Sequence, residues 1–180
     1  MPFLRKSGVF AGVLFVSFLF TSKAVGQAID EYQVKAGFVS SFARFVEWPP
    51  EAFKSPHEPF AICVLGQNPF GQTLSGLVAG KALGEHALEL REISDVRAAG
   101  GCHILFISSS ERLRFRSILA SLKAQSVFSI GDTNDFIAEG GVANLRVENG
   151  RVRIEINARA AKEKNLRISS RLMSLVKVVK

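Results

Sequence analysis

Hydrophobic residues follow helix and strand spacings along most of the chain. Phe38, Phe42 and Phe45 lie at i, i+4 and i+7, which predicts a helix over 29–46 that is stopped by Trp48-Pro49-Pro50. Uninterrupted apolar runs indicate buried strands, and alternating runs indicate half-buried ones. The other elements predicted in this way are strands at 60–65, 87–91, 102–107 and 127–130, and helices at 70–78, 108–122, 158–164 and 169–179.

The most specific local pattern is a β-hairpin near the C-terminus. Two alternating segments, 142–148 and 151–157, flank Asn149-Gly150, the dipeptide that best fits a two-residue hairpin turn. The short turn fixes the register, so Arg146 is expected to face Arg153. One side of this ribbon is then apolar and the other side is polar.

The order of the elements predicts the fold class. Strand, helix, strand, strand, helix, strand, hairpin and helix follow one another, which is typical of an α/β domain. We expect a single domain with a mixed parallel and antiparallel sheet flanked by helices, a C-terminal β-hairpin and a helical tail. Asn165 should break that tail in a left-handed conformation, and the last helix should bury Leu172, Leu175 and Val179.

The first 26 residues have the pattern of a secretory signal peptide. Arg5 and Lys6 precede an uncharged apolar run over 9–20, and small residues follow at 24–26. The apolar run is shorter than the roughly 20 residues that a membrane span needs. We therefore predict a cleaved signal peptide at 1–26 and an exported, periplasmic domain at 27–180 that is not embedded in a membrane. A buried N-terminal helix, an uncleaved anchor and a cleavage two residues later are the alternatives.

Removal of the signal peptide changes the charge of the chain. The formal net charge falls from +7 to +4, because Arg5, Lys6 and Lys23 leave and no acidic residue does. The remaining excess of basic residues is mild and spread along the chain, which is not the pattern of a nucleic-acid-binding arm. We therefore expect no nucleic-acid partner.

Export also changes the expectation for the two cysteines, Cys63 and Cys102. An even number of cysteines in an oxidising compartment favours a disulfide between them. Closing the loop between these two cysteines would stabilise the fold by roughly 4 kcal/mol in the chain-entropy model. Two buried free thiols are the alternative.

The sequence predicts neither catalytic residues nor a cofactor or metal site. The three histidines do not lie at metal-ligand spacing, and no nucleophile, base and orienting residue occur together, which disfavours an exported hydrolase. The segment 66–73 has the spacing of a phosphate-binding loop but carries Gln72 in place of its lysine. A sensor of a small ligand or anion, bound at the turns near Gly66 and Ser108, remains an alternative function.

The facing pair Arg146 and Arg153 is the strongest candidate for an interaction site. Like charges at opposed strand positions are mildly destabilising. Nearby Glu139, Glu148 and Glu155 could compensate them, or the arginines could form a docking surface for an acidic partner or anion.

Several segments of the chain form a recognisable set: Gly140-Gly141-Val142, Arg153-Ile154-Glu155-Ile156-Asn157, Leu166-Arg167-Ile168-Ser169-Ser170, Val34-Lys35-Ala36-Gly37-Phe38, 42–49, 66–71 and 102–108. Together they resemble the YfiR-type periplasmic repressor family. Their order and spacing, rather than any one motif, carry this resemblance, which spans essentially all of 27–180. Asn165 stands where that family has glycine, a change that a left-handed conformation tolerates.

This resemblance implies a function that composition alone does not indicate. Members of that family restrain an inner-membrane diguanylate cyclase by binding its periplasmic region, and an outer-membrane lipoprotein titrates them. The resemblance also implies a homodimer and matches Cys63 and Cys102 to one disulfide of the family. Glu155 matches a family glutamate and, by alternation, should lie on the outer face of the hairpin. We therefore predict a partner-binding site of Arg146, Arg153 and Glu155, with another membrane sensor as the alternative partner.

Overall fold

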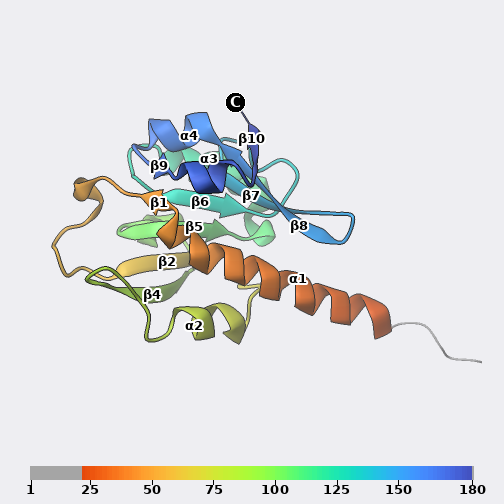
Figure 1. Cartoon of the computed structure of the whole chain (residues 1–180). Helices are drawn as coiled ribbons and strands as arrows, with labels where there is room; N and C mark the ends of the chain where they lie inside the picture. The colour runs from red at the N-terminus through yellow and green to blue at the C-terminus, as the bar shows by residue number, and fades with distance from the viewer. Residues whose placement is uncertain (1–21, 180) are drawn as a thin grey trace, which may run out of the picture.

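The computed structural model describes the backbone of residues 22–179 and the side chains of residues 31–179. Most of the predicted signal peptide therefore lies outside the described residues. Its last part, 22–26, belongs to helix α1 (Ser22–Ser41), whose N-terminal end points away from the sheet (Figure 1). Among the helices of residues 22–179, none combines the length and the apolar character needed to cross a bilayer.

An eight-stranded mixed sheet forms the centre of the domain, with the strand order β10-β8-β7-β6-β5-β2-β4-β3 (Figure 1). The neighbours from β4 to β7 are parallel, whereas β7–β8 and β3–β4 are antiparallel. β10 joins β8 in parallel and forms one edge. The strands are β2 (Phe60–Leu65), β3 (Ala82–Leu83), β4 (His86–Ile93), β5 (Cys102–Ile107), β6 (Phe128–Gly131), β7 (Ala143–Glu148), β8 (Arg151–Asn157) and β10 (Lys177–Val179).

Hydrophobic layers cover both faces of this sheet. One layer joins the sheet to α1, α2 (Gln72–Val78), α4 (Ala158–Glu163) and α5 (Ser170–Met173). The other joins it to α3 (Phe115–Ser121) and Phe136. Every residue of β2 and β5 is buried, because a parallel strand covered on both faces has no side exposed to water. The mixed α/β fold predicted from the element order is confirmed.

The hairpin prediction is confirmed to the residue. β7 and β8 pair Arg146 with Arg153 and Glu148 with Arg151, and Asn149 has a φ of 52°. Asn165 also adopts the predicted left-handed conformation, with a φ of 56°. The two-residue turn fixes this register locally, so no distant contact is needed to specify it.

The helix predicted over 169–179 is wrong beyond Met173. Residues Lys177–Val179 form strand β10 beside β8, and Leu175 is 78 % exposed where burial was expected. The apolar spacing of this segment fits a helix, but the unoccupied edge of β8 offers the last residues a strand ladder. That tertiary pairing overrides the local pattern.

Two short strands near the ends of the domain were not predicted. Helix α1 ends at Ser41, a 3-10 turn follows over Phe42–Arg44, and β1 (Val46–Glu47) then pairs with β9 (Arg167–Ile168). The predicted helix at 108–122 is likewise divided into a 3-10 helix over Ser109–Arg114 and α3. Strands of two residues are too short to produce a periodic pattern.

The ring of Phe136 accounts for Gly141, the second glycine of the Gly140-Gly141 motif, whereas Gly140 has a left-handed φ of 100°. This ring is fully buried beside the end of β6. A Cβ atom at Gly141 would lie 2.1 Å from the ring, and one at Gly131 would lie 2.3 Å from it. Both glycines therefore make room for Phe136, which packs on Phe115 of α3 with ring centroids 5.0 Å apart.

Candidate functional site

The predicted partner-binding residues lie together on the polar face of the hairpin, which we call the arginine face (Arg146, Glu148, Arg151, Arg153 and Glu155). The β7–β8 ladder places Arg146 opposite Arg153. Arg146 lies 3.4 Å from a carboxylate oxygen of Glu155 and 3.7 Å from one of Glu148. The two carboxylates therefore offset the charge of Arg146.

Glu155 occupies the predicted face, but its predicted exposure is wrong. The residue is only 5 % exposed, because β10 places Lys177 directly beside it. Lys177 Nζ donates a hydrogen bond of 2.8 Å to Glu155 Oε1. Burial alone would raise the pKa of Glu155, but this bond and the charges of Lys177 and Arg146 hold the pKa below its usual value. Glu155 is thus ionised and positions the basic side chains of Lys177 and Arg146.

Arg151 and Arg153 differ from Arg146 in forming no ion pair with a described residue. Both side chains are exposed, and no described carboxylate lies within ion-pair distance of either. The arginine face, together with Lys177, therefore presents more positive than negative charge to water. The arginines without an ion pair lie on β8, next to the edge strand β10.

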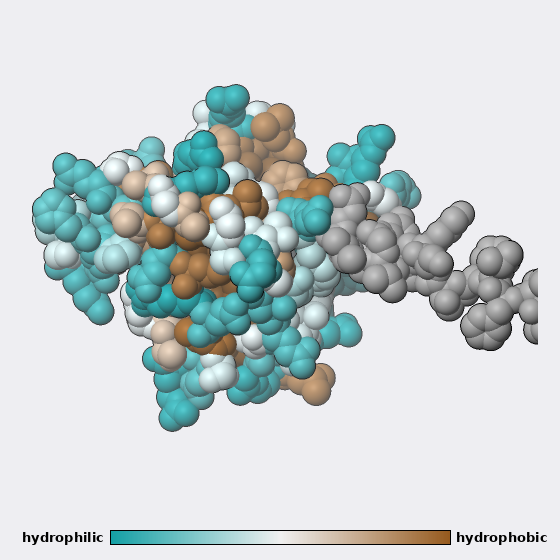
Figure 2. All heavy atoms as spheres, turned by 90° about the horizontal axis from the view of Figure 1, so that it is seen from below, coloured by the Kyte–Doolittle hydropathy of each residue, from teal (hydrophilic) through white to brown (hydrophobic). Residues whose placement is uncertain are grey.

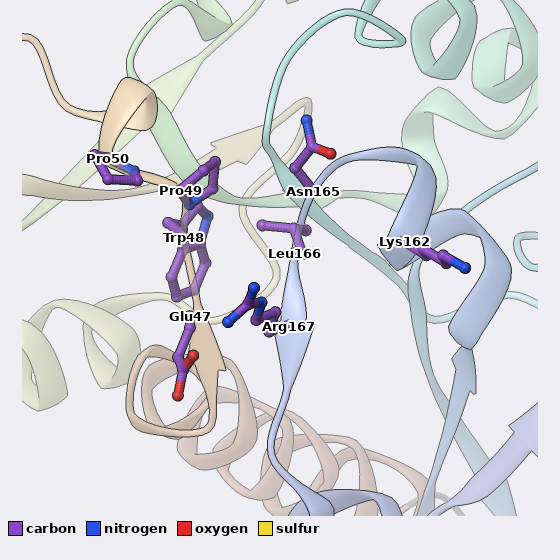
Figure 3. A pocket seen from close by; sticks show the side chains of 8 residues that line it. All are labelled: Glu47, Trp48, Pro49, Pro50, Lys162, Asn165, Leu166 and Arg167. Carbon is purple, nitrogen blue, oxygen red and sulfur yellow. The ribbon is translucent and has the colours of Figure 1, made fainter.

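A second candidate is a hollow between β1 and the end of helix α4. Its volume is about 450 Å³. Figure 3 shows the guanidinium of Arg167 lying near the indole of Trp48, whereas Lys162 points away. The β1–β9 pairing brings these residues together, since it places Glu47 opposite Arg167. The hollow thus joins two segments of the family resemblance that lie far apart in sequence. The lining is completed by Pro49, Pro50, Asn165 and Leu166.

Trp48 is anchored to the core through His103. The Trp48 indole N–H donates to the backbone carbonyl of His103 at 3.2 Å, and the Ala61 N–H donates to His103 Nδ1 at 3.1 Å. The hydrogen bond from Ala61 to His103 lies where the register of the β2–β5 pairing shifts. The His103 ring stacks on Phe53 and Phe60, and burial is the main cause that lowers its pKa to about 4. His103 is therefore a neutral structural residue of the core.

The predicted disulfide between Cys63 and Cys102 is confirmed. It joins β2 to β5 with a Cα–Cα distance of 5.9 Å. Both cysteines are buried, at 0 % and 4 % exposed. A soluble thiol can reach the bond only after the strands open.

The turns near Gly66 and Ser108, where a ligand was considered, pack against each other. The Gln67 N–H donates to Ser110 Oγ at 3.0 Å, and the Ser108 N–H donates to the Leu65 carbonyl at 3.0 Å. A Cβ atom at Gly66 would lie 2.5 Å from Ser110 Oγ. The backbone groups that could bind an anion are thus partly occupied by the protein itself. Among the described side chains, no group of His, Cys, Asp or Glu is arranged to hold a metal ion.

A buried polar cluster was not predicted from the sequence. Lys35 Nζ and the Tyr32 hydroxyl both donate to Asp132 Oδ2, at 3.0 Å and 2.9 Å. The side chains of Lys35 and Asp132 are 3 % and 4 % exposed, and burial raises the pKa of Tyr32. The cluster ties α1 to the end of β6. Its members are about a hundred residues apart, so no local spacing indicates it.

Comparisons with known proteins agree with this architecture. The YfiR/HmsC-like family model matches residues 32–177. No curated protein matches the chain. A conserved domain protein from Vibrio cholerae is 10 % identical with a TM-score of 0.58, and the ABC domain from Streptococcus pneumoniae in complex with L-Trp is 8 % identical with a TM-score of 0.55. Each comparison covers 83 % of this chain but 60 % of the other, so at this identity the two structures indicate the fold alone.

Proposed function

This chain belongs to the YfiR/HmsC-like family, and from this premise we propose that it is a periplasmic regulator which represses a membrane-bound diguanylate cyclase or a similar membrane sensor. The single observation that carries this proposal is the family match over residues 32–177, which includes the whole sheet except its last two positions. The regulator acts by binding the periplasmic region of its target. We propose that the signal peptide at 1–26 brings it there.

The disulfide is consistent with this location, because structural disulfides persist in oxidising compartments such as the periplasm. A protein on that side of the membrane can influence a cytoplasmic catalytic domain only through a segment that crosses the bilayer. Repression then requires tighter binding to the inactive state of the target than to the active state. Moving a target from 1 % to 99 % inactive requires a preference of about 10⁴-fold.

The arginine face supplies the contact that we propose for this binding. Arg153 and Arg151 are exposed and uncompensated, while Arg146 is held by Glu155. A cationic surface at a sheet edge is complementary to an acidic region of a partner and increases the rate of encounter. Arg153 is therefore proposed as the partner contact, with Glu155 as a positioning residue.

The family resemblance also supports a homodimer and a lipoprotein that competes for the regulator. Light scattering of the purified mature chain tests the first of these. A mass of twice that of one chain is expected, and a monomer at micromolar concentration would contradict it.

Deletion of the gene tests the proposed function itself. Cellular cyclic di-GMP, measured by mass spectrometry, is expected to rise in the deletion strain and to return to its original level when the gene is restored. An unchanged level in a host that carries and expresses the neighbouring cyclase gene would contradict the proposal.

A further inference from the structure

Strand β8 is covered by β10 along only part of its outer edge. β10 pairs with Glu155, Ile156 and Asn157, so the first half of β8 has no neighbour on that side among the described residues. The hairpin also extends past β6, which pairs with β7 only at Ala143 and Asn144. Residues 145–154 therefore form a two-stranded ribbon, whose β7 side has no strand partner beyond Asn144 and whose β8 side is open at residues 151–154.

The backbone groups on this open edge follow from the hairpin geometry. The Asn157 N–H donates to the carbonyl of Val142, the residue just before β7. Asn157 therefore directs its backbone hydrogen-bonding groups toward β7. Alternation along an antiparallel strand gives Arg151, Arg153 and Glu155 the same direction. Val152 and Ile154 must then point the other way. The Val152 N–H and C=O and the Ile154 N–H therefore face outward, and no described residue binds them.

Apolar side chains are exposed beside the same edge. Val147, which pairs with Val152, is 45 % exposed, and Val178 of β10 is 39 % exposed. Leu175, which leads into β10, is 78 % exposed. Three of the five exposed large hydrophobic residues of the described chain thus lie on the hairpin, on β10 or just before it. An open edge with apolar side chains is a template for another strand.

The charges on this edge decide which strand fits. Arg151 and Arg153 lie on one side of β8, and neither forms an ion pair with a described residue. A second copy of β8 would bring its own arginines against them, and like charges on facing strands oppose pairing. A strand with acidic residues at alternate positions would place its carboxylates beside both arginines. Its intervening apolar residues would lie beside Val152 and Ile154 of β8.

We propose that the open edge of β8 at residues 151–154 receives an extended acidic segment of the regulated partner as an added strand. Main-chain hydrogen bonds to Val152 and Ile154 provide the pairing, and Arg151 and Arg153 select the acidic segment. This proposal rests on the proposed function, because the segment is assigned to the protein that the chain represses. It defines the recognised chemistry as an acidic–apolar alternation in an extended backbone.

The backbone part of this proposal can be tested with one substitution. Val152→Pro removes an outward N–H while keeping the hydrogen bonds to β7, because those belong to the neighbouring residues. Val152→Ala is the matched control, since it also shortens the side chain but keeps the N–H. A fluorescent peptide of six alternating glutamate and valine residues is the probe, and the same peptide with lysine in place of glutamate is its control.

Fluorescence anisotropy measures the binding of each peptide to the disulfide-bonded chain. We expect Val152→Pro to bind the acidic peptide about tenfold more weakly than Val152→Ala does. Arg153→Glu should bind it about fivefold more weakly and should gain affinity for the lysine peptide. Equal binding by Val152→Pro and Val152→Ala, or equal binding of the two peptides to the wild-type chain, would overturn the proposal. Thermal unfolding of each variant verifies that the hairpin is folded.

Two further outcomes separate this proposal from the ones on which it depends. If deletion of the gene raises cyclic di-GMP but Val152→Pro still represses the cyclase, the proposed function stands and strand addition is refuted. If Val152→Pro changes the oligomeric state and leaves peptide binding unaltered, the edge pairs with a second copy of the chain, and the acidic-segment proposal is wrong.

Discussion

The buried ion pair between α1 and the end of β6 gives the sharpest test of the packing described above. Asp132→Asn keeps an acceptor for the Tyr32 hydroxyl but removes the charge that faces Lys35. Breaking a buried pair typically costs 3–5 kcal/mol, because the remaining charge stays buried. Lys35 keeps its second partner, Glu31, so we expect a loss at the low end, about 3 kcal/mol.

Urea unfolding followed by the fluorescence of the single tryptophan, Trp48, measures this loss. With a slope of about 2 kcal/mol per molar urea, the midpoint should fall by about 1.5 M. Glu163→Gln removes an exposed ion pair with Arg159 and should change stability by less than about 0.5 kcal/mol. The double variant Lys35→Met with Asp132→Asn should be more stable than Asp132→Asn alone. If Asp132→Asn shifts the urea midpoint no further than Glu163→Gln does, the reasoning is refuted.

Three other predictions concern the core. Replacing Cys63 and Cys102 by alanine should lower the free energy of unfolding by about 4 kcal/mol in guanidinium titrations, because the unfolded chain loses a cross-link. Gly141→Ala should cost about 2 kcal/mol in thermal unfolding through its clash with Phe136, and Phe136→Leu should recover part of that loss if the clash is the cause. The pKa of His103 is lowered to about 4 in the folded chain, so the neutral His103 ring contributes fully to the free energy of unfolding above pH 6.5. This contribution is lost as the pH falls toward 4. A His103→Gln variant should show a flatter stability profile over that range, and an unchanged slope would contradict the assignment.

The features that the sequence predicts well are those with local causes. The Asn149-Gly150 turn fixes the hairpin register, so the juxtaposition of Arg146 and Arg153 is predictable from spacing alone. The left-handed conformation of Asn165 follows in the same way from a residue type that tolerates it. Buried strands such as β2 and β5 are visible as apolar runs because both of their faces are covered.

The features that the sequence does not predict depend on distant partners. The burial of Glu155 requires β10, whose residues have helix-like spacing and pair only because the edge of β8 is open. The hollow beside Trp48 requires the β1–β9 pairing. The ion pair of Lys35 with Asp132 joins residues 97 positions apart. In each case the local sequence pattern predicts no contact, or predicts a different element, because the residue's partner is distant in the sequence and is brought close only by the fold.

The direct measurement of partner binding tests the central claim most closely. The mature chain, purified with its disulfide formed, is titrated against the isolated periplasmic region of the membrane-bound cyclase that deletion of the gene activates. Arg153→Glu is compared with Lys81→Glu, which makes the same change of charge at an exposed position next to β3, the opposite edge of the sheet. We predict that the wild-type chain and Lys81→Glu bind equally and that Arg153→Glu binds about tenfold more weakly. Absence of binding by the wild-type chain would contradict the regulatory function, and equal binding by all three would remove the arginine face from it.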